Sequence, residues 1–234
     1  MKKAFTLAEI LITLGIIGVV SALTIPTLVK RNTNETHVQQ LKKVYATLMQ
    51  AAETAMAENN VNDLSETVLG IQGNMSAAQS KAAVKNFFNT YFKVSVDCDS
   101  TPVPCFADSY KYLDGSNYNF SYHNFTFGDC VSLADGSAIC MNPGMGTRLA
   151  WWGDSTIDMH PWTQVFIDVN GSKGPNIIGR DFFEVSLYSD GKIAESYVLS
   201  AQKMQDDFDN KCNGGGGYGG CFSKIVLDGW KMDY

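Results

Sequence analysis

The strongest hydrophobic pattern lies in the first thirty residues. A nearly uninterrupted apolar run covers residues 10–29 and follows a short segment that contains Lys2, Lys3 and Glu9. As a helix, residues 5–29 would be about 37 Å long, which is enough to cross a bilayer core about 30 Å thick. The pattern therefore predicts a membrane-spanning segment near the N-terminus.

The charges around this segment indicate its direction. Lys2 and Lys3 precede the run, and no acidic residue precedes Glu9. The positive-inside rule then holds the N-terminus in the cytoplasm and places the rest of the chain outside. A cleaved secretory signal ending at residues 21–23 is the alternative, but such signals have a shorter apolar stretch without a carboxylate.

The helical period continues beyond the apolar run. Apolar or small side chains recur at steps of three or four, at positions 38, 41, 45, 48, 52 and 55. We therefore predict one helix over residues 6–58, bent at Pro26, in which residues 30–58 are an amphipathic continuation packed on a head. The polar break at residues 30–34 leaves open an anchor and a separate helix joined by a linker.

Residues 59–234 predict a globular head of about 170 residues, large enough for its own core. After a polar loop over residues 59–74, Ser76 and Gln79 form a capping box that opens a second helix. The expected buried face of this helix is Val84, Phe87, Phe88, Tyr91 and Phe92.

From Val94 onward the pattern favours antiparallel strands, because short aromatic and β-branched runs alternate with Gly, Asp and Asn. Asp-Gly pairs at 135–136 and 190–191 predict hairpin turns. The expected strands are residues 118–127, 131–141, 164–169, 182–187 and 193–199. The predicted fold class is α+β, a long N-terminal membrane-spanning helix packed on an antiparallel sheet.

Six cysteines lie beyond the predicted anchor, and export makes disulfides the default expectation. Six cysteines allow 15 pairings, but only six to nine residues, in a turn-like segment, separate the two members of each successive pair. This spacing predicts that Cys98 pairs with Cys105, Cys130 with Cys140, and Cys212 with Cys221. A zinc site is the alternative, and neither a CxxC pair nor a nearby His supports it.

A polar loop in the head offers a candidate metal site. Asp168, Asn170, Asn176 and Asp181 supply oxygens within a short segment, as calcium sites do. Turn chemistry is the favoured explanation of the same residues, because Asp, Asn and Gly cap their own backbone and tolerate positive φ. We expect no cofactor apart from this calcium alternative.

Residues 2–9, Lys-Lys-Ala-Phe-Thr-Leu-Ala-Glu, together with the apolar run and Pro26, resemble the N-terminal signature of type IV prepilins and type II secretion pseudopilins. The resemblance implies that residues 1–4 are a leader peptide, which a prepilin peptidase removes between Ala4 and Phe5 before methylating the new N-terminus. It also implies that Glu9 is the family's assembly glutamate and that Pro26 kinks the helix. Family members usually have Gly where this chain has Ala4.

A carboxylate within an apolar helix costs about 2.5 to 3.5 kcal/mol on insertion scales, so Glu9 needs a physical reason. After cleavage, the amine of Phe5 in a neighbouring subunit would neutralise Glu9 and set the axial register of bundled helices. The alternative is that Glu9 lies at the level of the lipid headgroups, where it costs little.

The resemblance implies a structural subunit of a type IV pilus or a type II secretion pseudopilus. The subunit would sit in the inner (cytoplasmic) membrane with its head outside, and then in a fibre in the periplasm or at the cell surface. Its expected partners are the prepilin peptidase, other pilin or pseudopilin subunits and the inner-membrane assembly platform. One alternative is a minor or tip subunit whose head binds a ligand, with Trp151, Trp152 and Trp162 in that head. Another is a membrane-anchored exported protein.

Catalysis finds little support in the sequence. His37, His123 and His160 are scattered, and no nucleophile elbow or metal-binding helix motif occurs. Removal of the leader would leave 16 basic and 24 acidic side chains, a formal net charge of −8. We therefore expect no enzyme, and binding to nucleic acid is disfavoured.

Overall fold

The computed structural model describes residues 6–70, 75–120, 123, 125–143, 162–195, 200–215 and 217–234. The predicted cut site at Ala4 and Phe5, and Trp151 and Trp152, lie outside these residues. The same holds for the side chain of Trp162.

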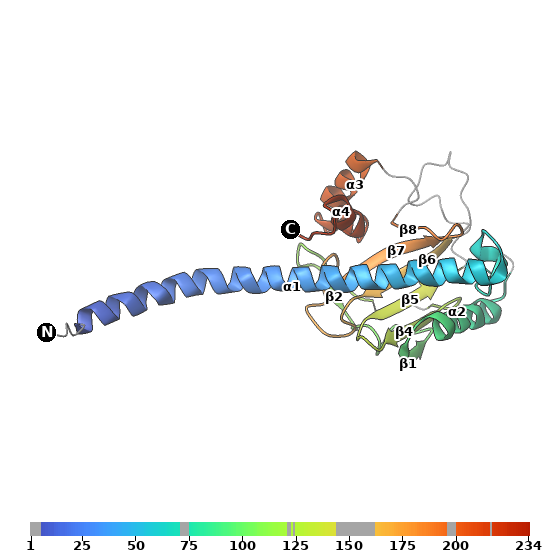
Figure 1. Ribbon diagram of the computed structural model, residues 1–234, viewed down its shortest axis with the longest axis horizontal. Coiled ribbons are helices and arrows are strands. Elements are labelled where there is room, and N and C mark those ends of the chain that lie inside the picture. The colour runs from blue at the N-terminus through green and yellow to red at the C-terminus, as the bar shows by residue number, and fades with distance from the viewer. Residues whose placement is uncertain are drawn as a thin grey trace.

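The long helix α1, Leu7–Asn59, contains 53 residues and is continuous. Pro26 lies inside it without ending it, so the alternative of two helices joined by a linker is wrong. Figure 1 shows the N-terminal part of α1 projecting away from the head with a gentle curve, while the C-terminal part lies across the sheet.

The head-covered part of α1 buries one stripe of side chains. The stripe begins at His37 and ends at Ala55, and its members recur at steps of one, three or four residues. The predicted amphipathic continuation is therefore confirmed. The buried residues are His37, Val38, Leu41, Val44, Leu48, Ala51, Ala52 and Ala55.

Among the described residues, six strands form one antiparallel sheet in the order β1-β4-β5-β6-β7-β8. Two further strands pair as a small second sheet. The strands of the main sheet are β1 (Val94–Asp99), β4 (Asp129–Leu133), β5 (Ala138–Asn142), β6 (Trp162–Asp168), β7 (Phe182–Tyr188) and β8 (Ile193–Ala194). The small sheet consists of β2 (Tyr110–Lys111) and β3 (Asn117–Tyr118).

Three strand predictions need correction. The strand expected over residues 118–127 is wrong, because β3 ends at Tyr118 and the aromatic rings that follow fill the core from irregular backbone, with Phe120 and Phe125 buried. The segment 131–141 is a hairpin and not one strand, since its Asp-Gly turn separates β4 from β5. The last strand ends at Ala194, and residues 196–199 lie outside the described part of the chain.

The second helix, α2, extends over Ala77–Tyr91, and the predicted capping box is present at its start. The Ser76 side chain accepts from the backbone N–H of Gln79, and the Gln79 side chain accepts in return from Ser76. Val84, Phe87 and Phe88 are buried on its inner face, as the pattern predicts.

All six cysteines form disulfides, in the pairs predicted from their spacing. The S–S distances are 2.06, 2.02 and 2.02 Å. Cys130 and Cys140 lie directly opposite each other on β4 and β5. Each bridge closes a short loop within the head.

The sequence did not predict the C-terminal helices α3 (Ala201–Asp207) and α4 (Cys221–Leu227). A π-helical turn at Phe208–Cys212 directly follows α3. The N-terminus of α4 is capped by a distant carboxylate. Glu195, which follows β8, accepts backbone N–H bonds from Gly220 at 2.9 Å, Phe222 at 2.9 Å and Ser223 at 3.0 Å. Burial raises the pKa of Glu195 to about 7, against the lowering effect of these donors.

We expect Glu195→Ala to destabilise the head by about 2 kcal/mol, because three backbone donors at the start of α4 lose their acceptor. Urea unfolding followed by tryptophan fluorescence measures the change. Glu53→Ala, which removes an exposed carboxylate from α1, is the control and should leave the unfolding midpoint unchanged. Equal midpoints for the two variants would contradict the capping role of Glu195.

Candidate functional site

The free part of α1 is the most unusual surface of the described chain. We call residues 7–29 the apolar segment. Its large aliphatic side chains are 45 to 76 % exposed, although such side chains normally lie in a core. They are Leu7, Ile10, Leu11, Ile12, Leu14, Ile16, Ile17, Val19, Val20, Leu23, Ile25, Leu28 and Val29. A continuous apolar surface of this size requires a cover of lipid or protein.

Within the described residues, α1 is the one helix that is long and apolar enough to cross a membrane, judged by length and composition. Its most apolar stretch has no part buried in the head. The structure therefore agrees with a single membrane span near the N-terminus.

The threonine side chains of the apolar segment make hydrogen bonds within their own helix. The hydroxyl groups of Thr13 and Thr24 donate to the carbonyl oxygens of Glu9 and Val20, four residues earlier, at 3.0 and 2.9 Å. Such internal pairing suits hydrocarbon, where water is absent and an unpaired donor is costly.

Glu9 closes a capping box with Thr6 at the first turn of α1. Its Oε2 accepts from both the backbone N–H and the hydroxyl of Thr6, each at 2.8 Å, and its own N–H donates to Thr6 Oγ1 at 3.2 Å. The helix N-terminus also favours a negative charge at this place. The Thr-x-x-Glu pattern could have predicted this pairing from sequence. Phe5, the expected partner of Glu9, lies outside the described residues.

Two glycines leave one part of the apolar segment open to close approach. A Cβ atom added at Gly15 or Gly18 would meet no other atom within 4 Å. Small residues in membrane helices allow neighbouring backbones to come near each other. These positions are therefore available for contact with another helix.

A polar boundary follows the apolar segment directly. Lys30 and Arg31 are exposed, and Arg31 pairs with Glu35 at 2.9 Å on the helix surface. The head begins one turn further on, where the Asn34 side chain donates to the backbone carbonyl of Met232 at 3.0 Å. The apolar segment and the head are thus separated by only a few residues of the same helix.

The two carboxylates of the predicted metal loop accept hydrogen bonds from the protein itself. Asp168 is buried, and it accepts from the Tyr110 hydroxyl at 2.5 Å and from the Asn170 N–H at 3.1 Å. Asp181 accepts from the N–H groups of Asn176 at 2.7 Å and Ile177 at 2.6 Å. Burial raises the pKa of both carboxyls, and for Asp168 the nearby Asp181 raises it further.

The other two oxygens of this loop are neutral amide oxygens. Asn170 Oδ1 and Asn176 Oδ1 are buried without a hydrogen-bond partner, and the Asn170 amide donates to Gly174 O at 3.2 Å. In the described part of the chain, His, Cys, Asp and Glu form no group of three or more that could hold a metal ion. The geometry favours the turn explanation of the loop over the calcium alternative.

The histidines serve structural contacts. His37 is buried on α1 near the backbone of Arg180, and burial lowers its pKa. His123 packs among aromatic rings, 3.2 Å from the Tyr118 hydroxyl. His160 lies outside the described residues.

Comparisons of the chain with protein-family models, curated proteins and solved structures found no match in any of the three.

We expect calcium to leave the unfolding temperature of the protein unchanged, because the Asp168 and Asp181 carboxyls already accept protein hydrogen bonds. Differential scanning fluorimetry with 1 mM EGTA or about 1 mM CaCl₂ measures this; ligand that binds only the folded state would raise the temperature. A rise that Asp168→Asn abolishes would restore the calcium alternative.

We expect Ile16→Asp to release the protein from membranes, because a carboxylate at the centre of a spanning helix costs about 3 kcal/mol. Extraction of membranes with alkaline carbonate separates integral from released protein. Ile16→Val keeps the apolar surface and should remain in the membrane pellet. Release of the unmodified protein under the same conditions would contradict a membrane span.

Proposed function

We propose that the protein is a pilin-class subunit that assembles into a type IV pilus or a type II secretion pseudopilus through the N-terminal part of α1. One observation carries the proposal. A single helix of 53 residues is covered by the head over its second part, yet exposes an apolar surface with a carboxylate at its start over its first part.

An ordinary membrane anchor does not need this construction. An anchor only has to keep a domain near the bilayer, and a flexible linker serves that purpose. In this chain the anchor and the main helix of the head are one continuous rod, about 80 Å long at 1.5 Å per residue. A rigid connection matters when the position of the helix must determine the position of the head.

The apolar segment has two successive covers in this proposal. Lipid covers it while the subunit waits in the membrane, and the same segments of other subunits cover it in the fibre. Close packing at Gly15 and Gly18 would bring the helices together. When the helices of other subunits replace lipid around the apolar segment, little apolar surface is exposed to water. The hydrophobic effect therefore opposes this replacement only weakly.

Glu9 sets the register of the packed helices. In a single subunit, both Thr6 donors hold Glu9 Oε2. In the fibre, the charge of the carboxylate would be neutralised by the N-terminal amine of Phe5 in a neighbouring subunit, after cleavage behind Ala4. An unpaired ion in an apolar surrounding is costly, so only the register that pairs the two charges is favoured.

The remaining parts of the proposal follow from this role. The protein acts in the inner membrane with its head outside the cytoplasm, and later in the fibre. Its partners are a prepilin peptidase, other pilin or pseudopilin subunits and an assembly platform in the membrane. It is a structural protein and not an enzyme, and nucleic acid is not its ligand.

N-terminal sequencing and intact mass of the protein, expressed with and without a prepilin peptidase, test the processing step. We expect an N-methylated Phe5 terminus that appears only with the peptidase. A terminus near residues 21–23, or an uncut chain in both cases, would contradict pilin-class processing.

Glu9→Ala tests the register. With the assembly system present, we expect the variant to be cleaved and membrane-bound, but at least about tenfold less abundant in sheared fibres, since the paired register loses its charge partner. Thr13→Val, which changes a polar residue one turn further along, should be incorporated normally. Equal incorporation of the two variants would exclude Glu9 from assembly.

A further inference from the structure

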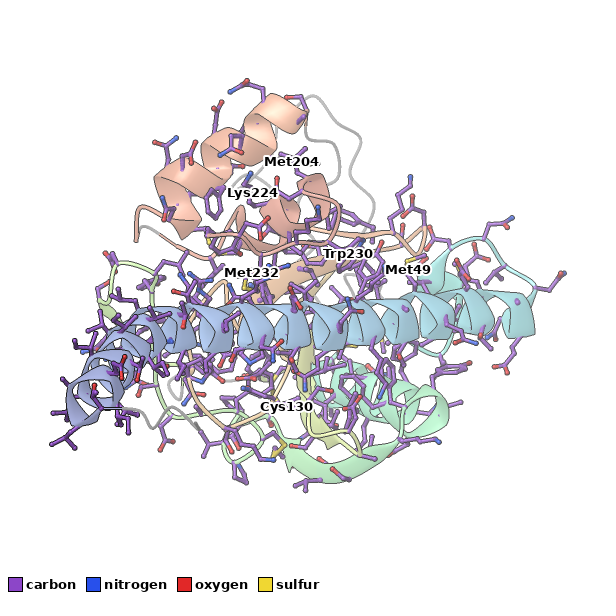
Figure 2. All side chains as sticks on the ribbon, turned by 60° about the vertical axis from the view of Figure 1, so that its left-hand side comes forward. Met49, Cys130, Met204, Lys224, Trp230 and Met232 are labelled. Atoms are coloured by element: carbon purple, nitrogen blue, oxygen red, sulfur yellow. A yellow bond between two sulfur atoms is a disulfide. The ribbon has the colours of Figure 1, made fainter. Side chains whose placement is uncertain are left out.

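The point at which α1 leaves the head is held by a segment that is distant in sequence. Residues 229–234 follow α4 and run along α1 toward the apolar segment. Figure 2 shows Met232 and Trp230 on the side of α1 that faces α3 and α4. At the near end, the Asn34 amide donates to Met232 O at 3.0 Å, and the Met232 side chain is buried against the core.

Aromatic packing holds the other end of this segment. The Trp230 ring lies 5.2 Å from the ring of Tyr45 and 6.0 Å from that of Phe222, measured between centroids. The ammonium group of Lys42 lies 5.6 Å from the Trp230 ring. The segment therefore follows α1 from residue 45 back to residue 34, about 16 Å of helix.

Tyr234 ties the segment to the β6–β7 connection. Its hydroxyl donates to Gly179 O at 2.9 Å, and its ring packs 4.7 Å from the ring of Phe208. The guanidinium carbon of Arg180 lies 5.0 Å from the same ring. Tyr234 therefore bridges a turn of the sheet and the π-helical turn of the C-terminal region.

The same turn contacts α1 directly, which closes the arrangement. His37 is buried on α1 and lies near the backbone of Arg180. Two hydrogen bonds thus lead from Asn34 to Met232 and, further along the chain, from Tyr234 to Gly179. The next residue, Arg180, lies near His37 of α1. We call residues 229–234, with these contacts, the clasp.

The clasp lies close to the end of the apolar segment. Asn34 is five residues beyond Val29, about 8 Å along the helix axis. Without residues 229–234, the first contacts that fix α1 to the head would be those of the buried stripe that begins at His37. The clasp therefore shortens the unsupported length of helix between the apolar segment and the head.

We propose that the clasp locks α1 to the head at the membrane boundary, so that the apolar segment and the head move as one rigid body. The clasp depends on two single hydrogen bonds, one from the Asn34 side chain and one from the Tyr234 side chain. Neither side chain belongs to a strand of the main sheet. Loss of the clasp should therefore loosen the first turns of the covered helix and leave the sheet intact. The consequence for assembly rests on the proposed function; the rigidity itself does not.

Hydrogen exchange by mass spectrometry, on the full chain in detergent micelles, tests the clasp. Asn34→Ala and Tyr234→Ala each remove one of its hydrogen bonds. We expect the backbone amides of residues 34–41 to exchange at least about tenfold faster in both variants, with β6 and β7 unchanged. Asn32→Ala and Lys231→Ala alter exposed neighbours and serve as controls. Unchanged exchange at residues 34–41, or an equal acceleration throughout the sheet, would overturn the proposal.

Fibre incorporation distinguishes this inference from the proposed function. If the unmodified protein enters fibres, we expect Tyr234→Ala to enter them several-fold less, although it remains membrane-bound and cleaved. Incorporation equal to that of the unmodified protein would overturn the coupling role of the clasp. If the unmodified protein enters no fibre while the exchange result holds, the proposed function fails and the rigid clasp stands.

Discussion

The structure depends on the continuity of one helix through two different surroundings. The side chains of α1 from His37 to Ala55 form a narrow buried stripe against the head, whereas the apolar segment is apolar on every side and has no cover. The helix continues through Pro26, although proline lacks a backbone N–H donor, and through the polar boundary that begins at Lys30. An orientation imposed on the apolar segment is therefore transmitted to the head, and this property distinguishes the molecule from a tethered domain.

The architecture of the head serves the same helix. The sheet supplies the surface on which the buried stripe packs, and α2 extends the core with Phe87 and Phe88. The three disulfides close loops at β1, at the β4–β5 hairpin and ahead of α4. The segment after α4 returns to α1 at Asn34. The covered helix is thus held from the sheet and from the C-terminal region.

The sequence alone predicted those features of the fold that depend on contacts between residues close together in the chain. The period of α1, the capping box at Ser76, the Asp-Gly turns and the disulfide pairs all depend on residues at most ten positions apart, and the structure agrees with them. Prediction failed at residues 118–127, because aromatic rings that resemble a strand pattern enter the core from irregular backbone. It also missed α4, whose cap is Glu195, 25 residues before Gly220.

The candidate site shows the same division. The apolar segment and Glu9 are visible in the first thirty residues, and the partner of Glu9 in its own chain, Thr6, follows from a three-residue spacing. The contact between Asn34 and Met232 joins residues 198 positions apart and needs the fold to become visible. The sequence offered the oxygens of Asp168 and Asp181 as metal ligands. It could not show that Tyr110 and the turn amides donate hydrogen bonds to these oxygens, because the fold brings the donors into place.

Photo-crosslinking from the apolar segment tests most directly the central claim that this surface packs against other copies. A photoreactive amino acid replaces Ile16, and crosslinked species are compared in cells with and without the assembly system. The account predicts a ladder of subunit–subunit products only when the system is present, and none from the same group placed at Glu66 on the head. A yield of subunit–subunit products that is unchanged by the assembly system, or crosslinks to lipid alone in both cells, would contradict it.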